Sequence, residues 1–155
     1  MSNRTQKAKE FFLAGYTCSQ AVLMAFAEDV GLEESLAAKI SCGFGGGMGG
    51  LRNVCGAVTG MFMVANMMYG FETPDNANHK TEHYAAIREL ATAFTNEYDT
   101  LICKDLLASL SGKLSENPSL RDDEYYKVRP CALYVEKAVA ILEEYMANHP
   151  VEAKE

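Results

Sequence analysis

Apolar residues along the chain recur at intervals of three and four, and no segment shows a convincing alternation of apolar and polar positions. The first spacing is that of one face of an α-helix, whereas alternation is typical of a half-buried strand. The pattern therefore predicts an all-α fold. We expect one domain over residues 1–155, a bundle of about six or seven helices whose ends fray over 1–3 and 149–155.

The first part of the chain predicts three helices, over residues 4–14, 17–29 and 33–42. Thr17 and Gln20 have the spacing of a capping box, with a hydroxyl at the N-cap and a glutamine at the third helical position. Gly31 supplies the stop after the second helix. The third helix is expected to end at Gly43.

A glycine-rich loop separates these helices from a very apolar one. Six of the chain's 12 glycines lie within residues 43–50, a density at which regular helix is not expected. Asn53 is the expected cap of the next helix, over residues 54–69. The run 54–71 carries no charge and approaches the length of a membrane span, but it contains Thr59 and Asn66. We therefore interpret it as the buried central helix of the bundle.

The second half predicts three more helices, over residues 77–98, 101–110 and 130–147. The longest has an apolar stripe at alternating intervals of three and four. Thr100 is the expected cap of the second, and Pro130 the first residue of the third. Residues 111–119 form a polar loop in this interpretation.

Composition is ordinary for a globular protein, with 155 residues, 48% hydrophobic and 23% charged. The net charge of −7 disfavours nucleic acid and anionic membranes as partners, because both are negatively charged. No apolar run follows the basic residues near the N-terminus, so we expect a cytoplasmic protein. The apolar helix stripes permit a homodimer.

Four cysteines share one predicted setting, the first turn of a helix: Cys18, Cys55, Cys103 and Cys131. The first turn presents free amide N–H groups and the positive end of the helix dipole, which favour a thiolate over a thiol. The thiolate is the form that attacks disulfides and binds metals. Cys42, the fifth cysteine, falls at a predicted helix C-terminus, where the dipole disfavours an anion.

Three functions remain open for these cysteines. They can form a thiol redox site, with Cys55 as its central member and the pairing among the four undetermined. They can instead ligate zinc or an iron–sulfur cluster. They can also be inert, packing as small hydrophobes in a structural or interaction module.

The arrangement of Cys18, Val54-Cys55-Gly56-Ala57-Val58-Thr59-Gly60, Cys103 and Cys131 resembles the C-GCAxxG-C-C family, named as redox-active for its cysteines. The likeness extends from about residue 11 to about residue 140. It implies that these four cysteines are the redox candidates, that Gly56, Ala57 and Gly60 are the motif's small residues, and that Cys42 has no counterpart. It implies an oxidoreductase-like role but supplies neither substrate nor redox partner.

Four glycines are candidates for contact with a bound group. Gly56 and Gly60 put small residues on one helix face beside Cys55, which suits a bound group or a closely packed helix. Gly45 and Gly47 belong to a GxGxxG string that follows a predicted helix, not a strand, so it does not indicate a dinucleotide site. Its amides could hold an anion or a cluster sulfur, or the loop could be a joint between helices.

Two weaker patterns carry no prediction of function. His79 and His83 frame an HxxEH string, which resembles that of inverted zinc proteases, but it lacks a third ligand. We interpret it as a solvated helix start. The methionines around the CGAxxG motif would suit copper(I), yet such spacing is more typical of core filling.

Overall fold

The computed structural model describes residues 1–110 and 112–151, and these residues form an all-α bundle. The longer helices are α1 (Asn3–Leu13), α2 (Cys18–Ala25), α3 (Glu34–Ser41), α5 (Gly56–Tyr69), α6 (Ala77–Tyr98) and α9 (Cys131–Asn148). Shorter elements are η1 (Cys42–Phe44), α4 (Gly45–Met48), α7 (Cys103–Leu106), η2 (Ala108–Leu110) and α8 (Asp123–Val128). The predicted fold class is confirmed.

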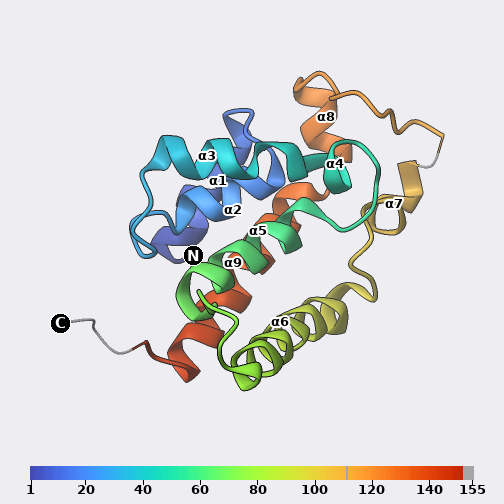
Figure 1. Ribbon diagram of the computed structural model, residues 1–155. Coiled ribbons are helices and arrows are strands. Elements are labelled where there is room, and N and C mark those ends of the chain that lie inside the picture. Colours follow the sequence, from blue (N-terminus) through green and yellow to red (C-terminus); the bar gives the residue numbers. More distant parts are fainter. Residues whose placement is uncertain (111, 152–155) are drawn as a thin grey trace.

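The central position of α5 is confirmed (Figure 1). It packs against α2, α6 and α9, while α1 packs against α2 and α9. Every residue from Gly56 to Met61 is buried, because this half of the helix faces other helices on all sides. No helix in the described part of the chain has both the length and the apolar character to cross a membrane.

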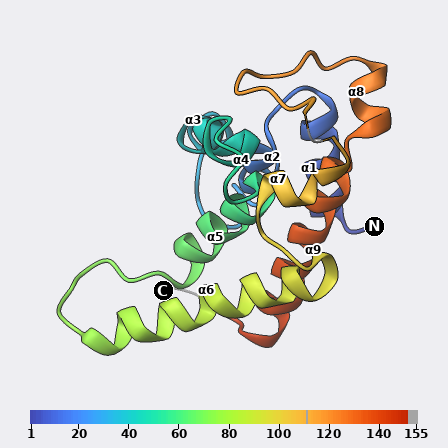
Figure 2. The ribbon, with the colours of Figure 1, turned by 90° about the vertical axis from the view of Figure 1, so that its right-hand side faces the viewer.

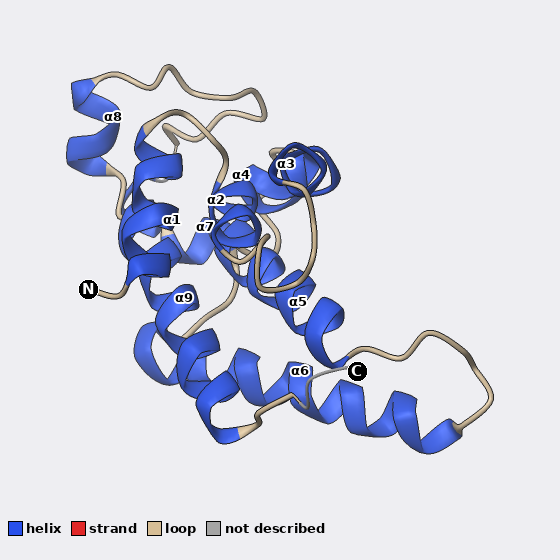
Figure 3. Cartoon of the chain, turned by 90° about the vertical axis from the view of Figure 1, so that its left-hand side faces the viewer, coloured by secondary structure: helices blue, strands red, loops and turns tan. Residues whose placement is uncertain are grey.

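The two ends of the bundle differ in construction (Figure 2). The long helix α6 lies at one end, where it packs against α5 and α9. The short elements α4, α7 and α8 gather at the other end, around the starts of α5 and α9. Long connections run between the helices there, and the loop before α8 is the most extended of them (Figure 3). The irregular end is the one that carries the cysteines.

Several predicted helix ends were correct. The Thr17 capping box is present, with the Thr17 hydroxyl accepting from the amide of Gln20 and the Gln20 side chain accepting from the amide of Thr17. The helix predicted over 77–98 has those bounds in the structure. Gly31 adopts φ +73°, the left-handed conformation expected after the second helix.

Other boundaries were wrong. The second helix ends at Ala25, and turns replace its expected last residues. The helix expected over 101–110 is divided into α7 and η2, and Thr100 instead accepts a hydrogen bond from the amide of Ile102. Pro130 is the N-cap of α9 and not its first helical residue. At the N-terminus, Ser2 caps α1 where fraying was expected, while residues 152–155 of the other expected frayed end lie outside the described residues.

Asn53 does not cap the central helix, because the backbone before α5 pairs with a segment that is distant in the sequence. Val54 and Ile102 form an isolated antiparallel bridge. In it the amide of Cys103 donates to the carbonyl of Asn53, and the amide of Cys55 donates to the carbonyl of Leu101. Cys55 becomes the N-cap of α5. This pairing fixes the two cysteines to one another through the backbone.

Candidate functional site: a cysteine pocket

All five cysteines line one pocket of about 240 Å³ at the irregular end of the bundle. The four predicted at helix starts are indeed there: Cys18, Cys103 and Cys131 are the first residues of α2, α7 and α9, and Cys55 caps α5. All five are free thiols. Residues far apart in the sequence therefore meet because four helices begin at the same place.

Cys42 shares the pocket but not the setting. It is the C-cap of α3 and is exposed, whereas Cys55, Cys103 and Cys131 are buried and Cys18 is partly buried. Its position at a helix C-terminus agrees with the expectation from sequence. Cys42 therefore lies at the mouth of the pocket, and the other four line its wall.

Cys131 is the cysteine that the site stabilises as a thiolate. The Cys18 side chain and the charges of Arg129 and Arg121 all favour the thiolate form of Cys131. Together they outweigh burial and lower the pKa of Cys131 to about 7. The interaction with Cys131 keeps the proton on Cys18 and raises the pKa of that thiol. The two residues thus form a thiol–thiolate pair.

Cys55 and Cys103 are thiols at neutral pH, although helix starts were expected to lower their pKa values. Burial raises the pKa of Cys55 to about 12, more than the amides of Ala57 and Val58 lower it. Burial also raises the pKa of Cys103, against the opposing effect of Arg52, whose Nη1 lies 3.7 Å from Cys103 Sγ. Desolvation by burial therefore outweighs the favourable effect of the helix start at both residues.

The glycine-rich loop lets the chain approach the cysteines closely. Gly46 and Gly47 adopt φ values of +65° and +66°, so α4 is not a regular helix. A Cβ on Gly47 would lie 2.7 Å from Cys103 Cβ and equally close to the backbone of Arg52. This position therefore requires glycine both for its conformation and for the space beside Cys103.

Three of the four candidate glycines line the pocket: Gly45, Gly47 and Gly56. A Cβ on Gly56 would lie 3.1 Å from Cys18 Cβ. Gly60 lies away from the pocket and packs against α2, where a Cβ would be 2.9 Å from the Ser19 carbonyl oxygen. At Gly60 the geometry therefore fits close helix packing.

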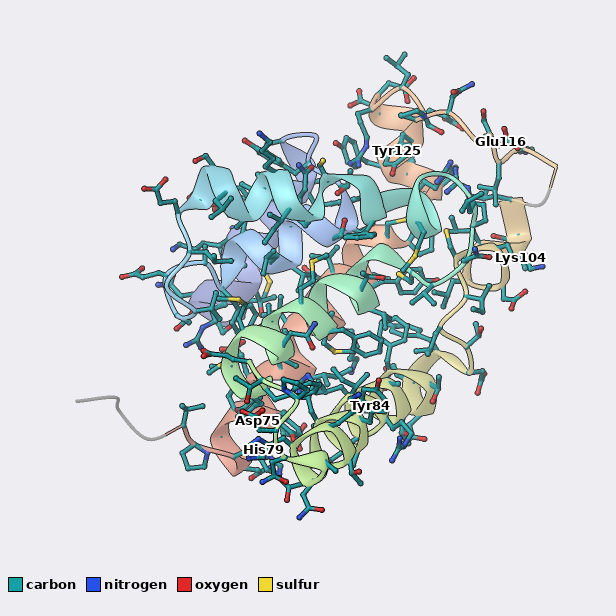
Figure 4. All side chains as sticks on the ribbon, in the orientation of Figure 1. Asp75, His79, Tyr84, Lys104, Glu116 and Tyr125 are labelled. Carbon is teal, nitrogen blue, oxygen red and sulfur yellow. The ribbon has the colours of Figure 1, made fainter. Side chains whose placement is uncertain are left out.

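Three arginines complete the pocket: Arg52, Arg121 and Arg129. Arg129 stands two residues before Cys131 in the sequence, whereas Arg52 and Arg121 stand in loops that no periodic pattern could place. The Arg121 guanidinium donates to the carbonyls of Phe12 and Tyr16 and lies over the ring of Tyr125. Tyr125 belongs to α8, a helix that the sequence analysis also missed (Figure 4). The missed signal was Asp122, which caps α8 by accepting from the amide of Tyr125.

The metal alternative finds no support in this arrangement. A zinc or cluster site needs several thiolates or imidazoles in contact with one centre. Within 1–110 and 112–151, no three His, Cys, Asp or Glu side chains are grouped so as to hold a metal ion. The HxxEH string lies at the start of α6, where His79 is exposed and His83 is buried with a ring nitrogen 2.7 Å from Asn66 Oδ1 (Figure 4).

Comparison with known proteins assigns the class that the fold and the cysteines suggest. The model of the C_GCAxxG_C_C family, described as "putative redox-active protein", matches residues 16–145. The chain belongs to this family. No curated protein and no solved structure matches it.

Proposed function

We propose that the protein is a dithiol redox protein in which Cys131 is the attacking thiolate and Cys18 the resolving cysteine. The observation that carries this proposal is that Cys18 and Cys131, the first residues of α2 and α9, line one pocket, where each is the largest single influence on the pKa of the other. A thiolate with a pKa near ambient pH combines a useful ionised fraction with good nucleophilicity. Cys18 lines the same pocket, which supports it as the thiol that attacks the mixed disulfide.

The reaction balances as a two-electron exchange. The Cys131 thiolate attacks one sulfur of a disulfide RSSR, which forms a Cys131–SR bond and releases RS⁻. Cys18 then gives up its proton to the released thiolate, and its sulfur attacks that of Cys131. A Cys18–Cys131 disulfide forms and the second RS⁻ leaves, taking a proton from solvent at neutral pH. RSSR is reduced to two thiols while the protein dithiol is oxidised.

Cys55 and Cys103 belong to the proposed site because they line the same pocket. Their raised pKa values make them slower nucleophiles at neutral pH, so the first attack comes from Cys131 and not from Cys55, the residue favoured from sequence. We propose that they exchange with the Cys18–Cys131 disulfide once it has formed. Replacement of Cys55 by alanine should then slow later exchange without abolishing the first step.

The proposal is tested by mass spectrometry of protein purified without oxygen and then treated with a small disulfide. We expect a loss of two hydrogens from the wild type, and peptide mapping should place the new bond between Cys18 and Cys131. Cys131→Ser should stay reduced, Cys18→Ser should stop at the mixed disulfide, and the control Cys42→Ser should behave as the wild type. A bond elsewhere, or no reaction before denaturation, would contradict the proposal.

The same spectra test the two alternatives. Added mass of iron and sulfide, or of zinc, that is lost on denaturation would favour the Cys18, Cys55, Cys103 and Cys131 metal site over the dithiol. Five thiols that react only after denaturation would instead favour inert packing. A purified protein whose mass equals that of the chain alone, and which reversibly loses two hydrogens on oxidation, supports the dithiol and neither alternative.

A further inference from the structure

We propose that the pocket selects a small disulfide that carries carboxylates close to its sulfur atoms. This inference rests on the proposed dithiol function and adds the chemical class of its substrate. It comes from the charges around the cysteines, which differ in sign from the charge of the whole protein.

The pocket is positively charged on a protein of net charge −7. Arg52, Arg121 and Arg129 line it, and Glu116 is the one carboxylate among its described lining residues. The ion pairs found in the described part of the chain involve Arg4, Lys9 and Lys137, and none of the three pocket arginines. Three guanidinium groups against one thiolate and one carboxylate leave an excess of positive charge.

Arg52 lines the pocket and has one donor that is unpaired within the described residues. Its Nη1 faces Cys103 Sγ and its Nη2 donates to the carbonyl of Ser115 at 2.7 Å, but its Nε is buried without an acceptor in the described residues. A buried donor left unpaired is unfavourable, so such groups are normally satisfied. A carboxylate in the pocket would satisfy it.

Arg129 is held in place while most of its donors remain available. Its Nη2 donates to Ser119 Oγ at 3.1 Å, and its guanidinium lies 5.0 Å from the centroid of the Tyr125 ring. Its charge acts on the Cys131 thiolate, and both residues line the pocket. A carboxylate bound by Arg129 would therefore lie in the pocket with the attacking atom, and the thiolate that leaves would be released into a positive field.

The size of the pocket limits the ligand. Its volume of about 240 Å³ is below the roughly 300–1,000 Å³ typical of sites for larger ligands. A short aliphatic disulfide with terminal carboxylates fits these limits. Such a molecule brings two negative charges and the sulfur–sulfur bond that Cys131 attacks.

The test compares three disulfides of similar size and different charge: 3,3′-dithiodipropionate (two negative charges), bis(2-hydroxyethyl) disulfide (neutral) and cystamine (two positive charges). The readout is the rate at which reduced protein loses two hydrogens. At low salt we expect the dianion to react about tenfold or more faster than the neutral compound and the dication to be slowest. Added salt should narrow these differences, because it screens the attraction.

Variants separate the pocket charge from the charge of the protein. Arg52→Gln should reduce the ratio of dianion to neutral rates several-fold, whereas Arg88→Gln, which makes the same charge change on the exposed surface of α6, should leave it unchanged. If circular dichroism shows that Arg52→Gln is unfolded, the ratio of dianion to neutral rates is measured with Arg129→Gln instead. The same decrease is expected there. Calorimetric binding of 3,3′-dithiodipropionate to Cys131→Ser supplies a readout without chemistry, and Arg52→Gln in that background should weaken it.

The outcomes distinguish the two proposals. Equal rates for all three disulfides in the wild type, or the fastest rate with cystamine, would overturn the charge selection while leaving the dithiol function in place. Failure to react with any of the three would overturn the dithiol function itself. A charge preference that Arg52→Gln and Arg129→Gln do not alter would also contradict the inference.

Discussion

The positive charge of Arg129 favours the thiolate of Cys131, which begins α9 two residues further along the chain. Together with Cys18 and Arg121, it lowers the pKa of Cys131 to about 7. Alkylation by iodoacetamide follows the thiolate, so its rate at Cys131 should rise with a midpoint near pH 7. Arg129→Gln should move the midpoint upward, and Arg88→Gln should not. A wild-type midpoint at or above about 8.5, the value of a free cysteine, would contradict this prediction.

Cys18 should influence the pKa of Cys131 independently of Arg129. Its side chain is the largest of the effects that lower this pKa, as expected of a hydrogen-bond donor to the thiolate. Cys18→Ala removes the donor and should shift the alkylation midpoint to higher pH. Cys18→Ser keeps a hydroxyl donor and should cause a smaller shift in the same direction. The measurement is the pH profile of Cys131 modification by peptide mapping, and an equal shift in the two variants would argue against the hydrogen bond.

The thiolate should also make stability depend on pH. Because the folded pKa of Cys131 is lowered from 9.0 to about 7, the ionised group favours the folded state above pH 7, fully so above about 9. The contribution is lost as pH falls through 7. Between pH 6 and 8.5 the wild type should gain about 2 kcal/mol of unfolding free energy relative to Cys131→Ser, since one pKa unit corresponds to about 1.4 kcal/mol and most of the shift acts by pH 8.5.

Urea unfolding of reduced protein at the two pH values provides this measurement. Cys18, Cys55 and Cys103 have raised pKa values, so they oppose folding only where unfolded thiols ionise, toward pH 9 and above. The comparison therefore stops at pH 8.5. Cys42→Ser serves as the control with one fewer exposed thiol. A constant difference between wild type and Cys131→Ser would show that the thiolate does not stabilise the fold.

Local patterns in the sequence were sufficient for most of the fold. The apolar spacing of α6, the Thr17–Gln20 capping box and the apolar run of α5 each determine structure through neighbours within a few residues. The predicted helix starts also identified four cysteines that share one setting, and the structure places these cysteines around one pocket. Of the expected caps at Thr17, Asn53 and Thr100, the structure has the one at Thr17, so the apolar spacing located these helix starts better than the caps did.

The remaining features depend on contacts between distant segments. The bridge between Val54 and Ile102 displaces the expected cap at Asn53, and no pattern near Asn53 reveals its partner. The pKa values of the cysteines are determined by burial and by Arg52, Arg121 and Arg129, which reach the pocket from loops. Sequence reasoning therefore identified the cysteines but ranked Cys55 above Cys131, because it included the helix dipole and omitted desolvation.

Gly47 should be the most sensitive glycine of the loop. Alanine at this position would combine a left-handed φ of +66° with a Cβ only 2.7 Å from Cys103 Cβ and from the backbone of Arg52. Gly15 provides the matched control, since its φ is +106° but nothing lies within 4 Å of a Cβ there. Gly15→Ala should cost about 1–2 kcal/mol of unfolding free energy from backbone strain, and Gly47→Ala about 1–3 kcal/mol more from the clash.

Urea denaturation of the two variants measures this difference in unfolding free energy. The reactivity of Cys103 shows whether the clash occurs beside that residue. Because the clash pushes on Cys103, folded Gly47→Ala should also show faster modification of Cys103 by a small alkylating reagent, while Gly15→Ala should match the wild type. If the two variants lose equal stability and Cys103 reacts as in the wild type, the glycine-rich loop does not pack on the cysteine pocket in the way the structure shows.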